Sequence, residues 1–413
     1  MTATKQPNVP AWLVAILIAL GAIGGGVVAA NQPAPVPTPV TTSTTTSVPL
    51  AEPVAVRRFA ADTATWNQPA STFGPSKTLQ SYAERWWKYG GGASQPGYVS
   101  AAFGDYSIPV YDAANKTGDA RVFLAVWAQN LYTSSIGVTM PWNPAWKPGT
   151  GNDGLMTIID YKTGTVWSVG GLGQWPINCV EPFGLGPNAR AGFDPTNPTH
   201  LCTSGMSKRD GIYTFNDSTT VDGRGMGIDQ IALTVRASEV RSGAIRHALA
   251  MGITATMFGP ACPGGSRDPG FGVSCGSWVK PATKLERINP NTINCPTPQV
   301  VSDAERSKTI PEGMRFAIRI TDAEITRWLD SRKYTGQLRE TARIFAVALR
   351  DYGWIIAETG CHGMLIQTDS AFAGDAAPVW KQLGITGTGT YPNGDLIAGL
   401  ITPERVYVVE PPS

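Results

Sequence analysis

The feature that most constrains this chain is a run of 20 residues without charge, Ala11 to Ala30. A helix of about 20 apolar residues spans the hydrocarbon core of a bilayer. Lys5 precedes the run and no charged residue follows it before Glu52, so the positive-inside rule predicts a cytoplasmic N-terminus and an external remainder. Val28-Ala29-Ala30 also has the small-residue spacing of a signal-peptidase site. Residues 1–30 are therefore predicted to be an apolar helix that is either a membrane anchor or a cleaved signal segment.

Residues 31–56 have the composition of a linker. They are rich in Pro and Thr and almost free of charge. Pro-rich segments favour the extended polyproline II conformation, which rises about 3.1 Å per residue. The segment is expected to act as a stalk, which leaves residues 57–413 as one folded domain outside the cell or at its surface.

Charge and composition narrow the class of protein. The 413 residues include 33 Lys and Arg against 31 Asp and Glu, so a nucleic acid is not expected as a partner. The 46 Gly and 33 Pro, together with 13 Trp, 12 Tyr and 12 Phe, are typical of a loop-rich extracellular β protein.

The six cysteines all follow the apolar run, and an even number in an exported domain predicts disulfides. Six cysteines allow 15 pairings. Closure of short loops favours Cys179–Cys202 and Cys262–Cys275, which leaves Cys295–Cys361.

Alternating apolar residues predict a mostly β domain. Met156–Asp160 and Thr165–Val169 flank the turn 161–164 as a hairpin. Helical spacing predicts two helices, Leu79–Tyr89 and Gln337–Tyr352, the second ending at Gly353. Many short strands with few helices favour a jelly roll or β-sandwich. Further strands are expected at 122–126, 231–235, 314–320, 355–356 and 406–409.

His247 is the candidate for acid–base chemistry. Read as a strand, residues 242–251 put Ile245, His247, Leu249 and Met251 on one face. Such a histidine is either part of the core or exposed in a groove. In the second case it would act as general acid or base, assisted by Asp153 or Asp160.

Aromatic residues supply the candidate binding surface. Trp142 and Trp146 lie in the Pro-rich loop MPWNPAWKPGTG. Exposed indole rings stack on flat or apolar ligands, including sugar faces, whereas buried ones anchor a loop on the core. Trp127, Trp167 and Trp175 lie near them in the sequence.

No metal or cofactor is expected. The chain has no CxxC pair, and its three histidines lack the spacing of zinc ligands. Asp222–Asp229 has the length of a calcium loop, but Arg224 stands where an oxygen ligand would be expected.

Six segments follow one another along the chain: Asp105–Tyr111, Asp153–Gly164, Ala237–Leu249, Pro311–Ile320, Ala346–Gly360 and Trp380–Ile385. In this order they resemble a group of uncharacterised secreted proteins of actinobacteria and related bacteria, some of them phage-encoded. The specific parts of the resemblance are the GxIxHAL segment within Ala237–Leu249 and the helix–YG–strand unit within Ala346–Gly360. Members of the group often have a histidine where this chain has Leu155. The resemblance implies a jelly-roll-like fold and export, and no activity.

Three functions follow as hypotheses. The favoured one is a stalked extracellular module that binds cell-envelope polysaccharide or another surface partner without catalysis. The alternatives are a structural surface or phage virion component of the tail type, and a polysaccharide lyase or hydrolase that uses His247. Enzyme activity is thus left open, with its absence favoured.

Overall fold

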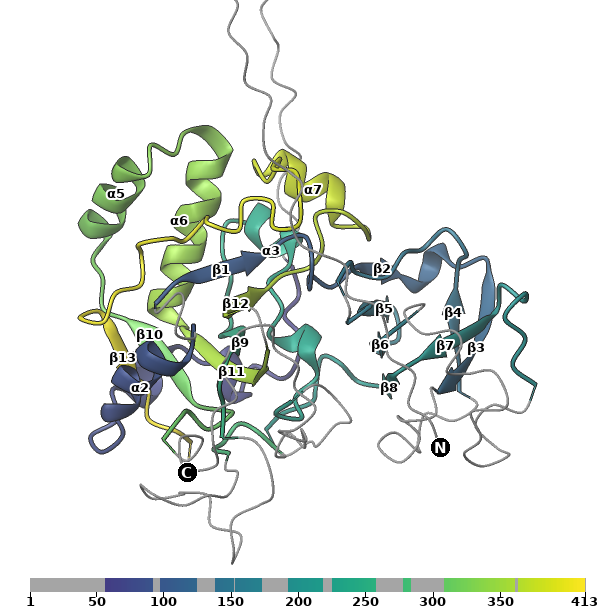
Figure 1. Ribbon diagram of the computed structural model, residues 1–413, viewed down its shortest axis with the longest axis horizontal. Helices are drawn as coiled ribbons and strands as arrows, with labels where there is room; N and C mark the ends of the chain where they lie inside the picture. Colours follow the sequence, from purple (N-terminus) through teal and green to yellow (C-terminus); the bar gives the residue numbers. More distant parts are fainter. Residues whose placement is uncertain are drawn as a thin grey trace, which may run out of the picture. The chain divides into compact units, whose positions relative to one another are not determined.

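The computed structural model describes residues 56–91, 97–124, 138–151, 153–172, 192–217, 225–257, 278–283, 308–360 and 363–412 (Figure 1). The chain divides into two compact units, Met1–Ala51 and Glu52–Ser413. The first unit, with the apolar run, lies outside the described residues. Across the ranges just given, no helix has the length and apolarity that crossing a bilayer requires.

A mixed six-stranded sheet forms the centre of the second unit. Its strand order is β1-β12-β9-β11-β10-β13, with β1 and β13 at the edges. β1 runs parallel to β12 and β9 runs parallel to β11, whereas the other neighbours are antiparallel. The strands are β1 (Val99–Ala102), β9 (Leu249–Ile253), β10 (Arg315–Ile318), β11 (Trp354–Thr359), β12 (Met364–Gln367) and β13 (Val406–Val408).

Helices cover one face of this sheet and form the main core with it. Met251 of β9 and Trp354 of β11 lie in one buried cluster with Phe345 of α6 and Trp86 of α2. The Trp86 and Trp354 ring centroids are 5.0 Å apart. The helices are α1 (Ala70–Phe73), α2 (Ser81–Tyr89), α3 (Ala237–Arg241), α5 (Asp322–Ser331), α6 (Gly336–Asp351) and α7 (Ala377–Gln382), with 3₁₀ turns η1 (Thr65–Asn67), η2 (Ala113–Asn115) and η6 (Gln230–Ala232).

The other face of the sheet packs on a second cluster. Ala250 of β9 and Ile355 of β11 meet Ile159 and Val166, which come from a four-stranded sheet of order β2-β5-β6-β8. A three-stranded sheet of order β4-β3-β7 follows. These strands are β2 (Val110–Asp112), β3 (Gly118–Leu124), β4 (Thr139–Trp142), β5 (Met156–Asp160), β6 (Thr165–Gly170), β7 (His200–Thr203) and β8 (Gly205–Arg209).

The sheet-rich class with few helices is confirmed. The predicted hairpin is present as β5 and β6, paired from Met156↔Val169 to Asp160↔Thr165. Parallel pairs occur in all three sheets, β2 with β5 and β3 with β7 in addition to the two above. A jelly roll pairs its strands antiparallel, so these mixed sheets do not support that more detailed prediction.

Two local predictions, one of a helix and one of a strand, have clear outcomes. The helix predicted at 337–352 is α6, and Gly353 follows it with φ +71°, in the left-handed region that glycine tolerates. A Cβ at Gly353 would lie 1.9 Å from the carbonyl oxygen of Phe316, so the close approach of β10 also requires glycine. The strand predicted at 231–235 is wrong, because Gln230–Ala232 is a 3₁₀ turn and Val235 makes only an isolated bridge.

Arg315 is a buried cation that ties the N-terminal segment to the sheet. Its guanidinium donates to the carbonyl oxygens of Tyr352 at 2.8 Å, Thr65 at 3.0 Å and Gln68 at 2.7 Å. Burial lowers the pKa of Arg315 to about 10, so the side chain remains charged at neutral pH. Arg315 is therefore covered by the segment 65–68 and is not exposed to solvent.

One cysteine lies within the described residues. Cys202, on β7, is disulfide-bonded and packs against Phe123. Cys179, Cys262, Cys275, Cys295 and Cys361 lie outside the described residues. The pairing proposed from loop length therefore stays a prediction.

Candidate functional site

His247 is buried, with 3% of its surface exposed. It lies in the turn that leads into β9, and not within the strand that the sequence pattern predicted. Its Nδ1 is 2.8 Å from the carbonyl oxygen of Ala248, and its Nε2 is 3.2 Å from Oε2 of Glu239. Both ring nitrogens thus lie within hydrogen-bond distance of a buried acceptor, a carbonyl oxygen and a carboxylate, and neither faces an open space.

Glu239 belongs to the same buried group. Its carboxylate accepts from Arg236 Nη2 at 2.7 Å and from the Arg236 backbone N–H at 3.2 Å. Burial opposes ionisation of Glu239, but the charges of Arg236 and His247 outweigh it and hold the pKa of Glu239 at about 2. The Glu239 carboxylate and the Arg236 guanidinium thus compensate each other's charge inside the fold, at the start of α3.

Asp369 completes this buried group. It accepts from the Ala237 N–H at 3.0 Å and from Trp380 Nε1 at 2.6 Å. Burial raises the pKa of Asp369 to about 8, although these hydrogen bonds and Arg236 oppose the shift. The buried polar group, defined as Arg236, Glu239, His247 and Asp369, is sealed from solvent, with each residue at most 5% exposed.

Asp160, proposed to assist His247, has a different role. Its Oδ1 accepts from the backbone N–H groups of Lys162 at 2.9 Å and Thr163 at 3.2 Å. Hydrogen bonds from Thr163, the side-chain one first, hold the pKa of Asp160 below its usual value. Asp160 therefore shapes the β5–β6 turn, and the hydrogen bonds of His247 go to Glu239 and Ala248 instead.

The tryptophans proposed as a binding surface are mostly buried where the structure describes them. Trp142 and Trp146 are each 7% exposed. Trp146 stacks on Tyr111 with ring centroids 4.9 Å apart, and Trp142 Nε1 donates to Pro198 O at 3.0 Å. The two rings therefore anchor their loop on the core, the second of the two alternatives that the sequence left open, and ligand binding by Trp142 and Trp146 stays a prediction. Trp167 is partly exposed, and Trp127 and Trp175 lie outside the described residues.

Other aromatic rings are exposed instead. Among the described residues, four large hydrophobic side chains are exposed, and three of them lie around strand β1: Tyr98 at 41%, Phe372 at 47% and Tyr391 at 40%. With Tyr106 they are named here the aromatic surface. Grouped exposed rings are unusual on a soluble domain and commonly mark a binding site.

The aromatic surface is assembled from three distant segments. The loop 390–394 lies along edge strand β1, since Ala101 N–H donates to Gly394 O at 3.0 Å and Asp105 N–H donates to Thr390 O at 2.9 Å. Gly104 permits this packing, because a Cβ there would lie 2.5 Å from Thr390 O and 2.8 Å from the Phe372 ring. The absence of a side chain at Gly104 thus allows Phe372 and the Tyr391 loop to pack at one place.

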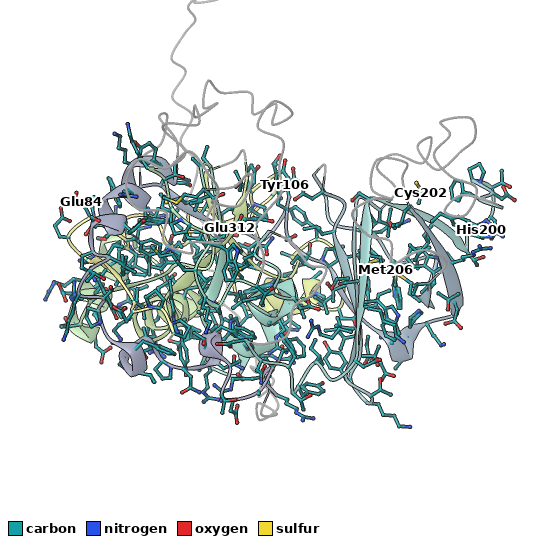
Figure 2. All side chains as sticks on the ribbon, turned by 90° about the horizontal axis from the view of Figure 1, so that it is seen from below. Glu84, Tyr106, His200, Cys202, Met206 and Glu312 are labelled. Atoms are coloured by element: carbon teal, nitrogen blue, oxygen red, sulfur yellow. The ribbon has the colours of Figure 1, made fainter. Side chains whose placement is uncertain are left out.

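Tyr106 lies in the connection between β1 and β2 (Figure 2). Its backbone has φ +64°, an uncommon conformation for a residue other than glycine. Burial, with the added effects of Tyr391, Asp153 and Asp105, raises the pKa of Tyr106 to about 12. The structure therefore brings Asp153 to the aromatic surface, and not to His247.

Charged groups flank the Tyr98 end of the surface. Burial raises the pKa of Tyr98, Asp395 adds to the rise, and Arg332 opposes it. Arg332 Nη2 and Asp395 Oδ2 form an ion pair at 2.5 Å. Such a surface can bind a ligand in two ways: the aromatic rings stack on an apolar ring face of the ligand, and the carboxylates and the guanidinium form hydrogen bonds with its hydroxyl groups.

The sequence carried only a weak signal for this surface. Two local features distinguish it: the close packing at Gly104, and the left-handed backbone conformation of Tyr106. Neither has a distinctive sequence pattern. Among the residues that the structure describes, no three metal-ligating side chains cluster.

Comparison of this chain with protein families, with curated proteins and with solved structures finds no match.

Proposed function

We propose that this protein is an exported, stalked surface module that binds cell-envelope polysaccharide through the aromatic surface, without catalysis. The observation that carries the proposal is the grouping of Tyr98, Phe372 and Tyr391 along strand β1. Exposed aromatic rings next to carboxylates match a ligand with apolar ring faces and many hydroxyl groups. A sugar polymer has both features.

The proposed location outside the cell rests on the N-terminal residues and on the disulfide. An uncharged run at Ala11–Ala30, followed by a Pro/Thr stalk, favours a membrane anchor or a signal segment with the domain outside. The disulfide at Cys202 agrees with an oxidising compartment.

The proposed absence of catalysis rests on His247. Its two ring nitrogens lie within hydrogen-bond distance of buried acceptors, and its ring is not open to a substrate. General acid–base catalysis needs a titratable group within hydrogen-bond reach of the reacting atom. A lyase or hydrolase that uses His247 is therefore the less favoured reading.

A sedimentation experiment tests the proposal and separates a polysaccharide from a protein partner. The full chain, purified in a non-ionic detergent, is mixed with insoluble actinobacterial cell walls and centrifuged. Walls stripped of protein by protease are compared with untreated walls and with walls from which the accessory polysaccharide has been hydrolysed. We expect retention on protease-treated walls and its loss on polysaccharide-free walls. Retention that disappears with protease treatment would refute the polysaccharide proposal and favour a surface protein.

A further inference from the structure

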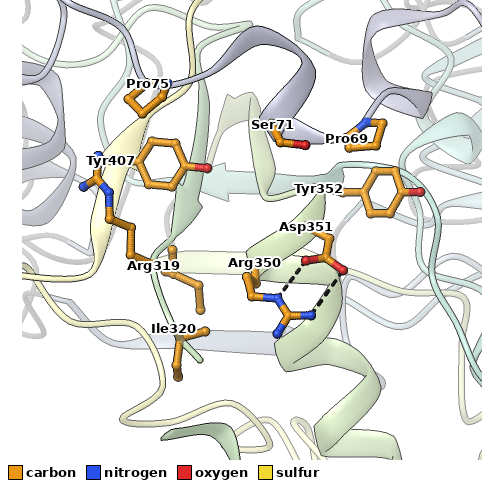
Figure 3. Close-up of a pocket in the computed structure, with 10 residues that line it drawn as sticks. Pro69, Ser71, Pro75, Arg319, Ile320, Arg350, Asp351, Tyr352 and Tyr407 are labelled. Atoms are coloured by element: carbon orange, nitrogen blue, oxygen red, sulfur yellow. Dashed lines mark hydrogen bonds and ion pairs between the residues drawn. The ribbon is translucent and has the colours of Figure 1, made fainter. Parts of the chain in front are cut away.

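A polar pocket of about 560 Å³ lies on another part of the described unit, where the C-terminus of α6 meets β10 and β13 (Figure 3). The polar residues of its lining are Ser71, Arg319, Arg350, Asp351, Tyr352 and Tyr407. A pocket of roughly 300–1,000 Å³ is the size that holds a small molecule. None of these residues belongs to the aromatic surface.

Arg319 is the exposed cation of this pocket. Its guanidinium carbon lies 4.4 Å from the centroid of the Tyr407 ring. Within the described ranges no carboxylate forms an ion pair with it. The guanidinium lies over the Tyr407 ring, and within the same described ranges its N–H groups have no hydrogen-bond partner, which suits bidentate binding of a carboxylate or a phosphate.

Arg350 is the second cation of the lining, and its charge is largely compensated. It pairs with Asp351 at 2.7 Å and with Asp322 at 2.5 Å. The Asp322 side chain is 87% exposed, so water screens much of its charge. Arg350 therefore adds donors to the pocket and little net charge.

Buried Arg315 adds positive charge behind the pocket wall. Its three partners are carbonyl oxygens and not carboxylates. One of them, Tyr352 O, follows the C-terminus of α6, whose dipole supplies the equivalent of about half a negative charge. That offsets only part of the Arg315 charge. Asp351 also lines the pocket, so the three cations Arg315, Arg319 and Arg350 face the two carboxylates Asp351 and Asp322, an excess of one positive charge.

We propose that this pocket binds the acidic group of a small sugar, a carboxylate or a phosphate, through Arg319, with the Tyr407 hydroxyl and Ser71 as further hydrogen-bond partners. Figure 3 shows Tyr407, Ser71 and Arg350 around the same space. The site is separate from the aromatic surface and goes beyond the proposed function. An acidic sugar fits because it combines an anion for the guanidinium with hydroxyl groups for the neutral donors.

Isothermal titration of the full chain in non-ionic detergent at low salt tests this site. The probes are glucuronate, glucose 6-phosphate and inorganic phosphate, with glucose as the neutral control. We expect saturable binding of at least one acidic sugar, no binding of glucose, and a loss of about tenfold or more in affinity for Arg319→Gln. Arg343→Gln, an exposed arginine of α6 paired with Glu340 and outside the pocket, is the matched control and should bind as the wild type does.

The arms of the experiment distinguish the sources of the anion. Tighter binding of glucuronate assigns a carboxylate, and tighter binding of glucose 6-phosphate assigns a phosphate. Absence of saturable binding by all three anions, or unchanged affinity in Arg319→Gln, would overturn the proposal. Retention on cell walls should be unaffected by Arg319→Gln, so failure of this site and failure of the aromatic surface give different results.

Discussion

His247 Nε2 lies 3.2 Å from Glu239 Oε2, and this contact assigns the histidine to the interior of the fold. Replacement by alanine removes a hydrogen-bond partner of the buried Glu239 carboxylate while Arg236 remains paired with it. We expect His247→Ala to lower the free energy of unfolding by about 1–3 kcal/mol and to leave retention on cell walls unchanged. Chemical denaturation and sedimentation on the same sample check both parts. An unchanged denaturation midpoint together with loss of a polysaccharide-degrading activity would instead support catalysis.

The low pKa of Glu239 predicts that the folded protein loses stability in acid. Its pKa in the folded protein is about 2, below the usual value of a free glutamate. A carboxyl with a depressed folded pKa stabilises the fold above its unfolded pKa, and this contribution disappears as the pH falls through the folded value. We expect the wild type to lose on the order of 3 kcal/mol between pH 4.5 and pH 2 through this group. Glu239→Gln should lack this part of the acid dependence in urea titrations at each pH, and identical slopes for both proteins would contradict the assignment.

The raised pKa of Asp369 predicts a pH dependence of stability opposite in sign to that of Glu239. Its folded pKa of about 8 lies above the usual value, so the folded state holds the proton that the unfolded state releases. Stability contributed by the protonated form is present below about pH 4 and is lost as the pH rises to 8. Asp369→Asn cannot titrate. The deficit in melting temperature of Asp369→Asn relative to the wild type should therefore shrink from pH 5 to pH 8. A deficit that grows over this range would show that the ionised carboxylate is the form the fold requires.

Several elements could be predicted from the sequence because their signals are local. The β5–β6 hairpin follows from two alternating runs around one turn, and α6 follows from its apolar stripe and Gly353. Helix α5 was missed although Thr321 and Glu324 form a capping box before it, with Glu324 N–H donating to Thr321 Oγ1 at 3.2 Å. The run 231–235 was misread because a short buried apolar segment has no period to separate a strand from a turn.

The candidate site could not be predicted because its contacts are not local. Ser100 of β1 contacts Met364 of β12 across 264 positions of sequence, and no local pattern specifies that pairing. Backbone hydrogen bonds place the loop that carries Tyr391 along β1. The sequence left Trp146 as either an exposed ring or a buried anchor of its loop, and the contact with Tyr111 buries it.

The variant Trp146→Ala distinguishes a role in anchoring the loop on the core from a role in ligand binding. Because its ring is buried against Tyr111 and Trp142, Trp146→Ala should cost about 3–5 kcal/mol of stability. Where the variant is still folded, retention on cell walls should match the wild type. Urea denaturation measures the first quantity and sedimentation the second. A normal denaturation midpoint with lost retention would return the binding role to this tryptophan.

Gly104 tests how the aromatic surface is assembled. Gly104→Ala places a methyl carbon 2.5 Å from Thr390 O, so the 390–394 loop must move away from β1. We expect a loss of about 1–3 kcal/mol in stability and weaker retention. Gly118→Ala is the matched control, because a Cβ there meets no atom within 4 Å. Equal behaviour of the two variants would show that the loop does not depend on this contact.

The most direct test of the central claim is the affinity of ring-deleted variants for solubilised cell-wall polysaccharide, measured by affinity electrophoresis. Phe372→Ala/Tyr391→Ala should bind at least about tenfold more weakly, which is ~1.4 kcal/mol. Phe372 is 47% and Tyr391 40% exposed, so part of each side chain is packed, and a cooperative thermal melt checks that the double variant is folded. Tyr161→Ala removes a ring of similar exposure, 44%, outside the aromatic surface and should bind as the wild type does. Wild-type affinity in the double variant, or equal losses in the double variant and in Tyr161→Ala, would contradict polysaccharide binding by the aromatic surface.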